Sequence, residues 1–182
     1  ARAREPYDRS FRLGPGDAAV VGRYALYCAN TGRDAEALAA ATRATELDPL
    51  NPLTRLALGY VHYAARRYRQ AIAEVEAGLA QNPELGSGNA TMASALFLLG
   101  DLDGARRAFA AESNALYRET GLAIVEQRAG RTDAALAARR NVESGLGIGQ
   151  LTLYQQAQIA AQWGERDTAA RLLTEARGAV DS

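Results

Sequence analysis

Lysine is absent from the sequence, cysteine occurs once, and aromatic residues make up only 7% of the 182 residues. Without lysine, a Schiff base, a Ser-Lys dyad and a P-loop of the usual kind are excluded. The single cysteine, Cys28, excludes an internal disulfide and a thiolate metal cluster. It leaves the compartment open between the cytoplasm and, for a membrane-anchored full-length protein, the periplasm. Alanine forms about a fifth of the chain, which favours an all-α protein.

Neither a net charge nor a long apolar run is present. The 21 basic residues, all arginine, balance 21 acidic residues, so no net field attracts a phosphate backbone or an anionic lipid. No apolar run approaches the roughly 18 residues that a membrane span needs, and the N-terminal residues lack the apolar core of a signal peptide. We therefore expect no nucleic-acid partner and no direct membrane insertion.

A short turn pattern recurs along the chain at nearly constant spacing. It starts at residues 32, 66, 100, 130 and 164, so the intervals are 34, 34, 30 and 34 residues. A period of this length indicates a repeat protein whose neighbouring units share a core.

Small side chains stand at two fixed distances from these turns. Two antiparallel helices that cross closely beside a short turn need such residues where their backbones meet. The column seven residues before each turn contains Ala25, Gly59, Ala93, Ala123 and Ala157, and the column five residues after it contains Ala37, Ala71, Ala105, Ala135 and Ala169.

Apolar residues at helical spacing precede and follow each turn, and Pro49 and Pro83 close the first two units because proline ends a helix. We expect about eleven helices, one near residues 5–13 and then five antiparallel pairs. The expected organisation is one array over residues 1–182. In it, residues 3–16 form the second helix of a truncated repeat, and residues 17–50, 51–84, 85–114, 115–148 and 149–182 form five helix-turn-helix repeats.

Several segments carry a resemblance to a known family. Leu58-Gly59-Tyr60, the segment from Arg67 to Ile72, Gly78-Leu79 and Asn82-Pro83 resemble the signature of the tetratricopeptide repeat (TPR). The similarity covers nearly the whole chain and is strong in three units. It implies a right-handed α-α superhelix, a TPR-like solenoid, whose first helices line a concave groove and whose second helices form the convex back.

Two units depart from this pattern. The third is four residues short and has no closing proline, so we expect its second helix to end near Glu112 and Ser113 or Asn114 to cap the next helix. The fourth ends in a glycine-rich link from Gly145 to Gly149, which we interpret as a hinge rather than a phosphate loop because no strand precedes it.

The N-terminal half-repeat indicates that the chain was cut from something longer. The composition and turns of the chain are similar to those of TPR regions attached to bacterial signalling proteins, such as nucleotide cyclases and winged-helix regulators.

Three single residues that could belong to a functional site are expected to have packing roles instead. His62 is the only histidine, and we expect it to be a hydrogen-bonded packing residue rather than a catalytic one. One histidine cannot support a zinc site, so we expect no metal and no cofactor. Cys28 stands in the same column and should be buried, and Trp163 should close a helix end rather than stack on a ligand.

Two charges of the fourth unit occupy columns that hold mainly apolar or small residues elsewhere. These residues, Glu126 and Arg139, face each other across the expected hairpin. Because charges close to a core are rarely unpaired, we expect an ion pair or a shared polar network between them.

The TPR resemblance assigns the residues ten, six, three and two positions before each turn to the groove. Its N-terminal half is then apolar and aromatic, whereas its C-terminal half is richer in amide and guanidinium groups. The expected binding residues are Leu26, Leu56, Tyr60, Tyr63, Ser94, Phe97, Leu98, Ile124, Gln127, Arg128, Tyr154 and Gln158.

These residues favour a non-catalytic protein-protein interaction scaffold that binds a peptide or protein segment in a concave, partly aromatic groove. A carboxylate clamp of the TPR type is not expected, because its positions hold Gly22, Leu26, Ala57, Ser87 and Thr91. The alternative is the sensory or regulatory TPR region of a larger bacterial signalling enzyme or transcription regulator. A homo-oligomer in which a neighbouring copy covers the aromatic residues also stays open.

Overall fold

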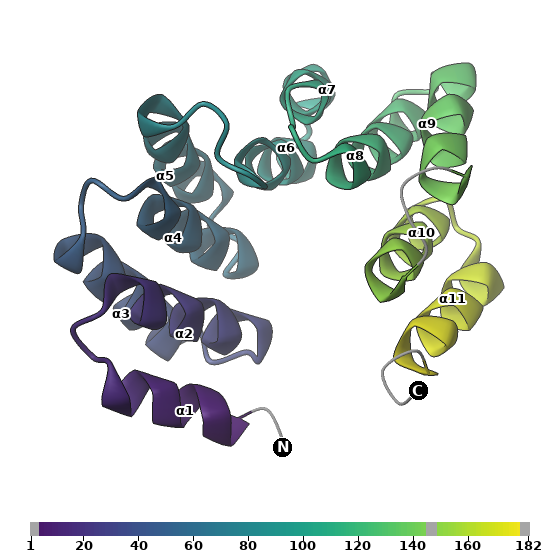
Figure 1. The fold of residues 1–182 in the computed structure, drawn as a ribbon. Helices are drawn as coiled ribbons and strands as arrows, with labels where there is room; N and C mark the ends of the chain where they lie inside the picture. The colour runs from purple at the N-terminus through teal and green to yellow at the C-terminus, as the bar shows by residue number, and fades with distance from the viewer. Residues whose placement is uncertain (1–3, 145–148, 179–182) are drawn as a thin grey trace. The chain divides into compact units, whose positions relative to one another are not determined.

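A computed structural model describes residues 4–144 and 149–178, which form eleven α-helices and no strand (Figure 1). The all-α fold expected from the sequence is therefore confirmed, whereas most of the glycine-rich link, residues 145–148, lies outside the described residues. No described helix has the length and apolar character needed to cross a membrane. The helices are α1 (Arg4–Leu13), α2 (Ala18–Asn30), α3 (Asp34–Leu47), α4 (Pro52–Ala64), α5 (Tyr68–Gln81), α6 (Gly88–Leu98), α7 (Leu102–Ala110), α8 (Ala115–Arg128), α9 (Thr132–Ser144), α10 (Gln150–Gln162) and α11 (Arg166–Gly178).

The chain divides into two compact units, Ala1–Leu99 and Gly100–Ser182. In the first unit α2 packs on α3 and α4 on α5, and α6 packs against both α4 and α5. In the second unit α8 packs on α9 and α10 on α11, while α7 packs on α8. The boundary falls at the third turn, so the pairing of α6 with α7 stays a prediction.

The five turns have the same backbone geometry at the position expected from the sequence. Gly32, Gly100, Gly130 and Gly164 have φ angles of 73°, 87°, 74° and 83°, in the left-handed region that glycine adopts without steric cost. Arg66 occupies this position in the second turn with φ 59°. The second turn therefore keeps the left-handed conformation although Arg66 has a side chain that makes this conformation less favourable.

The two columns of small residues are buried, as the repeat pattern predicts. Ala25, Ala93 and Ala123 before the turns have no exposed surface, and neither do Ala37 and Ala71 after them. The hairpins that lie within one unit therefore close on small side chains, which lets their two backbones approach closely beside the turn.

Side chains cap the first turn of several helices. Asp17 Oδ1 accepts hydrogen bonds from the Ala19 and Val20 amides at 2.8 and 3.1 Å, and Asn114 caps α8 in the same way. Because α7 ends at Ala110 and Asn114 caps α8, the prediction that the second helix of the third unit ends near Glu112 and that Ser113 or Asn114 caps the next helix is confirmed.

Helix α1 packs on the first unit through aromatic rings. Phe11 stacks on Tyr24 and Tyr7 on Tyr27, each pair with centroids 4.4 Å apart. Arg33 adds an ion pair of 3.3 Å to Asp8. Helix α1 is therefore packed on the α2–α3 hairpin.

The prediction of an ion pair or a shared polar network between Glu126 and Arg139 is wrong for the described residues, because each charge has a different partner. Glu126 is only 6% exposed and pairs with Arg131, which the turn after α8 brings back over it. Arg139 instead binds Glu165 with 2.6 and 3.0 Å hydrogen bonds. The sequence placed Arg139 within its own hairpin, whereas its side chain reaches the turn of the next one.

Trp163 closes the end of α10, as expected. Its indole Nε1 donates a 3.3 Å hydrogen bond to the Ala123 carbonyl oxygen, and the Arg139 guanidinium lies 4.9 Å from its ring centroid. The ring therefore connects α10 to both helices of the preceding hairpin.

Candidate functional site

The first helices of the repeats form one layer in each unit. Helix α2 contacts α4 and α4 contacts α6, whereas α3 and α5 make no contact among the described residues. The second unit has the same arrangement, because α8 contacts α10 and the described parts of α9 and α11 do not touch. Since the first helices lie closer together than the second helices, they form the inner side of each unit.

Three columns of these first helices remain accessible. The residues six, three and two positions before each turn are partly or fully exposed in every repeat. We call this surface the first-helix face. It contains Leu26, Ala29 and Asn30 on α2, Tyr60, Tyr63 and Ala64 on α4, Ser94, Phe97 and Leu98 on α6, Ile124, Gln127 and Arg128 on α8, and Gln158, Ala161 and Gln162 on α10.

Tyrosine residues and a hydrogen bond organise this face in the first unit. The rings of Tyr60 and Tyr63 lie 6.2 Å apart, and that of Tyr68 lies 6.1 Å from Tyr63. The Tyr60 hydroxyl donates a 2.7 Å hydrogen bond to Asn30 Oδ1, and Asn30 Nδ2 donates to the Leu26 carbonyl at 2.9 Å. Two neighbouring repeats therefore hold the Tyr60 ring in one orientation.

Apolar side chains of α6 extend the same unit's exposed face. Leu98 is 49% exposed and Phe97 is half-buried. Asn30 and Tyr68 are absent from the twelve expected binding residues. The only sequence signal for Asn30 is its place in the column that also contains Leu98, and Tyr68 follows directly after a turn.

In the second unit the first-helix face is polar. Gln127 and Arg128 on α8 and Gln158 on α10 are exposed, while Ile124 is half-buried against the core of α8, α9 and α10. This part of the surface offers amide and guanidinium donors around one apolar residue.

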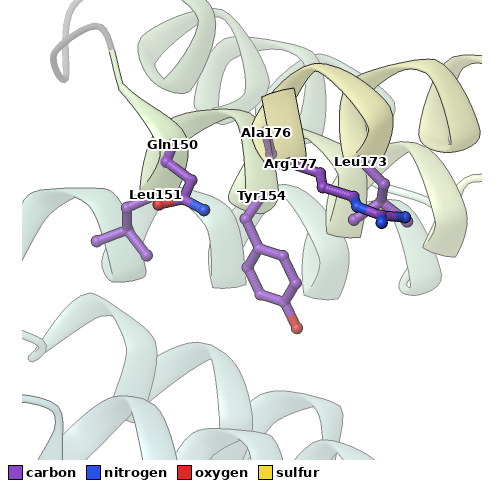
Figure 2. Close-up of a pocket in the computed structure, with 6 residues that line it drawn as sticks. All are labelled: Gln150, Leu151, Tyr154, Leu173, Ala176 and Arg177. Carbon is purple, nitrogen blue, oxygen red and sulfur yellow. The ribbon is translucent and has the colours of Figure 1, made fainter. Parts of the chain in front are cut away.

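The residues ten positions before each turn differ in exposure from one repeat to the next. Gly22 and Thr120 in this column are buried, and Leu56 is half-buried. Tyr154 is exposed but lies in a pocket between α10 and α11 (Figure 2). The structure therefore brings Tyr154 together with residues of α11, not with the other expected binding residues.

His62 is half-buried, but its environment differs from the expected one. Its Nδ1 atom is buried and has no hydrogen-bond partner among the described residues, so the expected hydrogen bond is not found at this atom. Burial lowers the pKa of His62, Glu74 raises it and Arg67 lowers it further. The neutral imidazole is therefore favoured in the folded state. Cys28, in the same column, is fully buried as expected.

We expect the protein to lose stability as pH falls below about 6.5, the usual histidine pKa, because the unfolded chain then binds a proton that folded His62 resists. Urea unfolding followed by circular dichroism at pH 7 and pH 5 measures this loss. His62→Phe should reduce the difference between the two midpoints. An unchanged difference would show that other groups cause it.

No group of three potential metal ligands occurs among the described residues. Asn89, in a triplet that fits a glycosylation site, lies within α6. No family model matches the sequence, and no curated protein matches it significantly.

Solved structures with the same fold are numerous. YrrB, described as a TPR protein with an unusual peptide-binding site, is 21% identical with a TM-score of 0.56, covering 94% of this chain and 91% of its own. A thermophilic TPR protein of Thermus thermophilus, TTC0263, is 17% identical with a TM-score of 0.72, covering 91% and 92%. PilF of Pseudomonas aeruginosa is 17% identical with a TM-score of 0.65, covering 94% and 80%. The chain therefore has the fold of tetratricopeptide-repeat proteins.

Proposed function

We propose that the chain is a non-catalytic scaffold that binds a peptide or protein segment on its first-helix face. The observation that carries this proposal is the accessibility of the same three columns in every repeat. Accessible columns on a packed layer form a continuous surface within each unit, and the side chains on that surface vary from repeat to repeat. Such variation suits recognition, since packing alone would favour similar residues in every repeat.

The first unit offers apolar and aromatic contacts. Tyr60, Tyr63 and Phe97 are half-buried, so each residue is packed on the protein and still has surface that a ligand can contact. Tyrosine and other large side chains dominate the binding energy of many interfaces because they bury much area and lose few rotamers. The Asn30 contact adds to this by fixing Tyr60 before a ligand binds.

The second unit offers polar contacts. Gln127 and Gln158 present side-chain amides that can pair with a peptide backbone, and Arg128 presents a guanidinium that favours an acidic group. The face of the first unit therefore suits a segment with apolar side chains, and the face of the second unit suits a peptide backbone or acidic groups.

Similarity to YrrB supports a binding role only through the shared fold, because the identity is 21%. What YrrB binds does not transfer to this chain residue by residue.

A random-peptide phage library selected on the whole chain tests the proposal. We expect Leu98→Glu to weaken the selected peptides about tenfold or more, because it places a charge in the apolar part of the first-helix face. Leu50→Glu is the matched control, since Leu50 is 83% exposed and lies outside this face. Fluorescence anisotropy gives the dissociation constants, and circular dichroism checks that both variants fold.

The assignment is wrong if Leu98→Glu and Tyr60→Ala both retain wild-type affinity while Leu136→Glu, on the second helix α9, abolishes binding. That pattern would place the binding surface on the second helices.

A further inference from the structure

The second of the five turns differs from the others in charge. Residues 66–70 include Arg66, Arg67 and Arg69 and no acidic residue. Each corresponding segment, 32–36, 100–104, 130–134 and 164–168, contains at least one aspartate or glutamate. All three arginines are exposed. We call residues 66–69 the arginine turn, and it concentrates positive charge in a chain whose net charge is zero.

The charges of the arginine turn are not neutralised by the protein. In the first and fourth turns, Arg33 and Arg131 pair with carboxylates. None of the three arginines of the second turn forms an ion pair among the described residues. No acidic residue stands three or four positions from any of them, which is the spacing at which helix neighbours pair. Glu74, farther along α5, binds Arg55 at 2.8 Å.

Arg66 is also unfavourable for the turn itself. Its φ angle is 59°, whereas the other four turns have glycine at this position. A side chain in the left-handed region raises the energy of the backbone, and glycine would relieve that cost. Turn formation therefore does not explain an arginine here, and a role of its side chain does.

The arginine turn is continuous with the aromatic part of the first-helix face. Tyr68 stands between Arg67 and Arg69, and its ring centroid lies 6.1 Å from that of Tyr63. The ring of Tyr63 lies 6.2 Å from that of Tyr60. All three tyrosines are half-buried, so exposed guanidinium groups and partly exposed rings occur side by side.

We propose that the arginine turn and the adjacent tyrosines bind an acidic segment of a partner protein. Aspartate or glutamate side chains of that segment pair with the three arginines, and neighbouring apolar side chains pack on Tyr60 and Tyr63. An extended chain advances about 3.3 Å per residue, so the acidic and apolar residues of the ligand lie within about four residues of each other. This inference rests on the proposed function, because it assigns the charge of the ligand that the first unit binds on the first-helix face.

A nucleic acid fits this surface less well than an acidic protein segment does. A single strand needs a basic track along about 4–16 nucleotides, whereas the unpaired positive charge is concentrated in one turn. Asp34 in the preceding turn is exposed and would repel a phosphate backbone that extended to that turn. A few carboxylates of a protein match the size of the arginine turn.

The random-peptide library selected on the whole chain tests this inference, because it does not impose a charge on the ligand. We expect the selected peptides to be enriched in aspartate and glutamate. The double variant Arg67→Gln/Arg69→Gln should weaken a selected peptide about fivefold. Arg106→Gln/Arg140→Gln is the matched control, since it makes the same change in net charge at exposed positions of α7 and α9. Raising the salt concentration from about 0.05 to about 0.5 M should weaken binding to the wild type more than binding to the first double variant.

Arg66→Gly gives a readout that a purely structural role would not produce. It should weaken the selected peptide, because one guanidinium is lost, and raise the urea midpoint of unfolding, because glycine relieves the left-handed backbone. Fluorescence anisotropy measures the first effect and circular dichroism the second. Unchanged affinity together with a raised midpoint would show that Arg66 does not bind the ligand.

A neutral change, Leu98→Ser, separates failure of this inference from failure of the proposed function. Peptides that depend on Leu98 but are not enriched in acidic residues, or are insensitive to all the arginine variants, would overturn the inference and leave the first-helix face. Peptides that depend on the arginines but not on Leu98 would reject that face and the joint site with it. A selection that yields no peptide would overturn both. Tighter binding of a single-stranded DNA of about 12 nucleotides than of any selected peptide would show that the arginine turn binds phosphates instead.

Discussion

Gly121→Ala should destabilise the second unit by about 3 kcal/mol, at the upper end of the cost of overpacking a core. Gly121 lies in α8 against the ring of Phe109 from α7, and an added Cβ atom would overlap that ring. Phe109 is 7% exposed and has little room to move. Urea unfolding followed by circular dichroism gives the change in free energy.

The same pair provides its own control. In a Phe109→Ala background the ring is gone, so Gly121→Ala should cost much less, and the two substitutions should be strongly coupled. Gly178→Ala should have little effect, because no atom lies within 4 Å of the added Cβ atom. Purely additive costs for Phe109→Ala and Gly121→Ala would mean that the two residues do not pack as described.

Gly59→Ala should destabilise the first unit by about 1–2 kcal/mol, even though helix propensity alone would favour alanine by about 1 kcal/mol. A Cβ atom on Gly59 would lie 2.6 Å from Val75 Cγ2 and 3.2 Å from the Ala71 carbonyl oxygen. The steric cost therefore exceeds the gain in propensity.

The sign should reverse when the valine is removed. Ala25 and Ala41 stand at the two corresponding positions of the first repeat, so Val75→Ala recreates a combination that the fold already contains. In that background we expect Gly59→Ala to stabilise the protein. A loss of stability in both backgrounds would show that Val75 is not the cause. Chemical unfolding of the four proteins measures this directly.

The sequence predicted features that depend on local backbone chemistry. Turn positions were predictable because glycine marks the left-handed residue at four of five turns, and hairpin contacts were predictable because small residues recur at fixed distances. The requirement for glycine at position 59 was not predictable from the sequence. Its column contains alanine in the other repeats, and the space it leaves is filled by Val75 from the opposite helix.

Contacts between repeats were less predictable than contacts within them. Arg139 pairs with Glu165 of the next hairpin, and the Tyr60 hydroxyl donates a hydrogen bond to Asn30 of the previous hairpin. Both depend on how one hairpin is rotated against another, which the period of the sequence does not specify. The place of Tyr154 was also hard to predict, because the residues ten positions before each turn can pack against the following repeat. Gly22 does so.

Methyl NMR of the whole chain, with a peptide selected from the random library, tests the proposed binding surface most directly. The methyl signals of Leu26 and Leu98, on the first-helix face, should shift on titration, whereas those of Leu50 and Leu136 should not. Shifts at Leu136 without shifts at Leu26 and Leu98 would contradict the proposal, because they would place the peptide on the second helices.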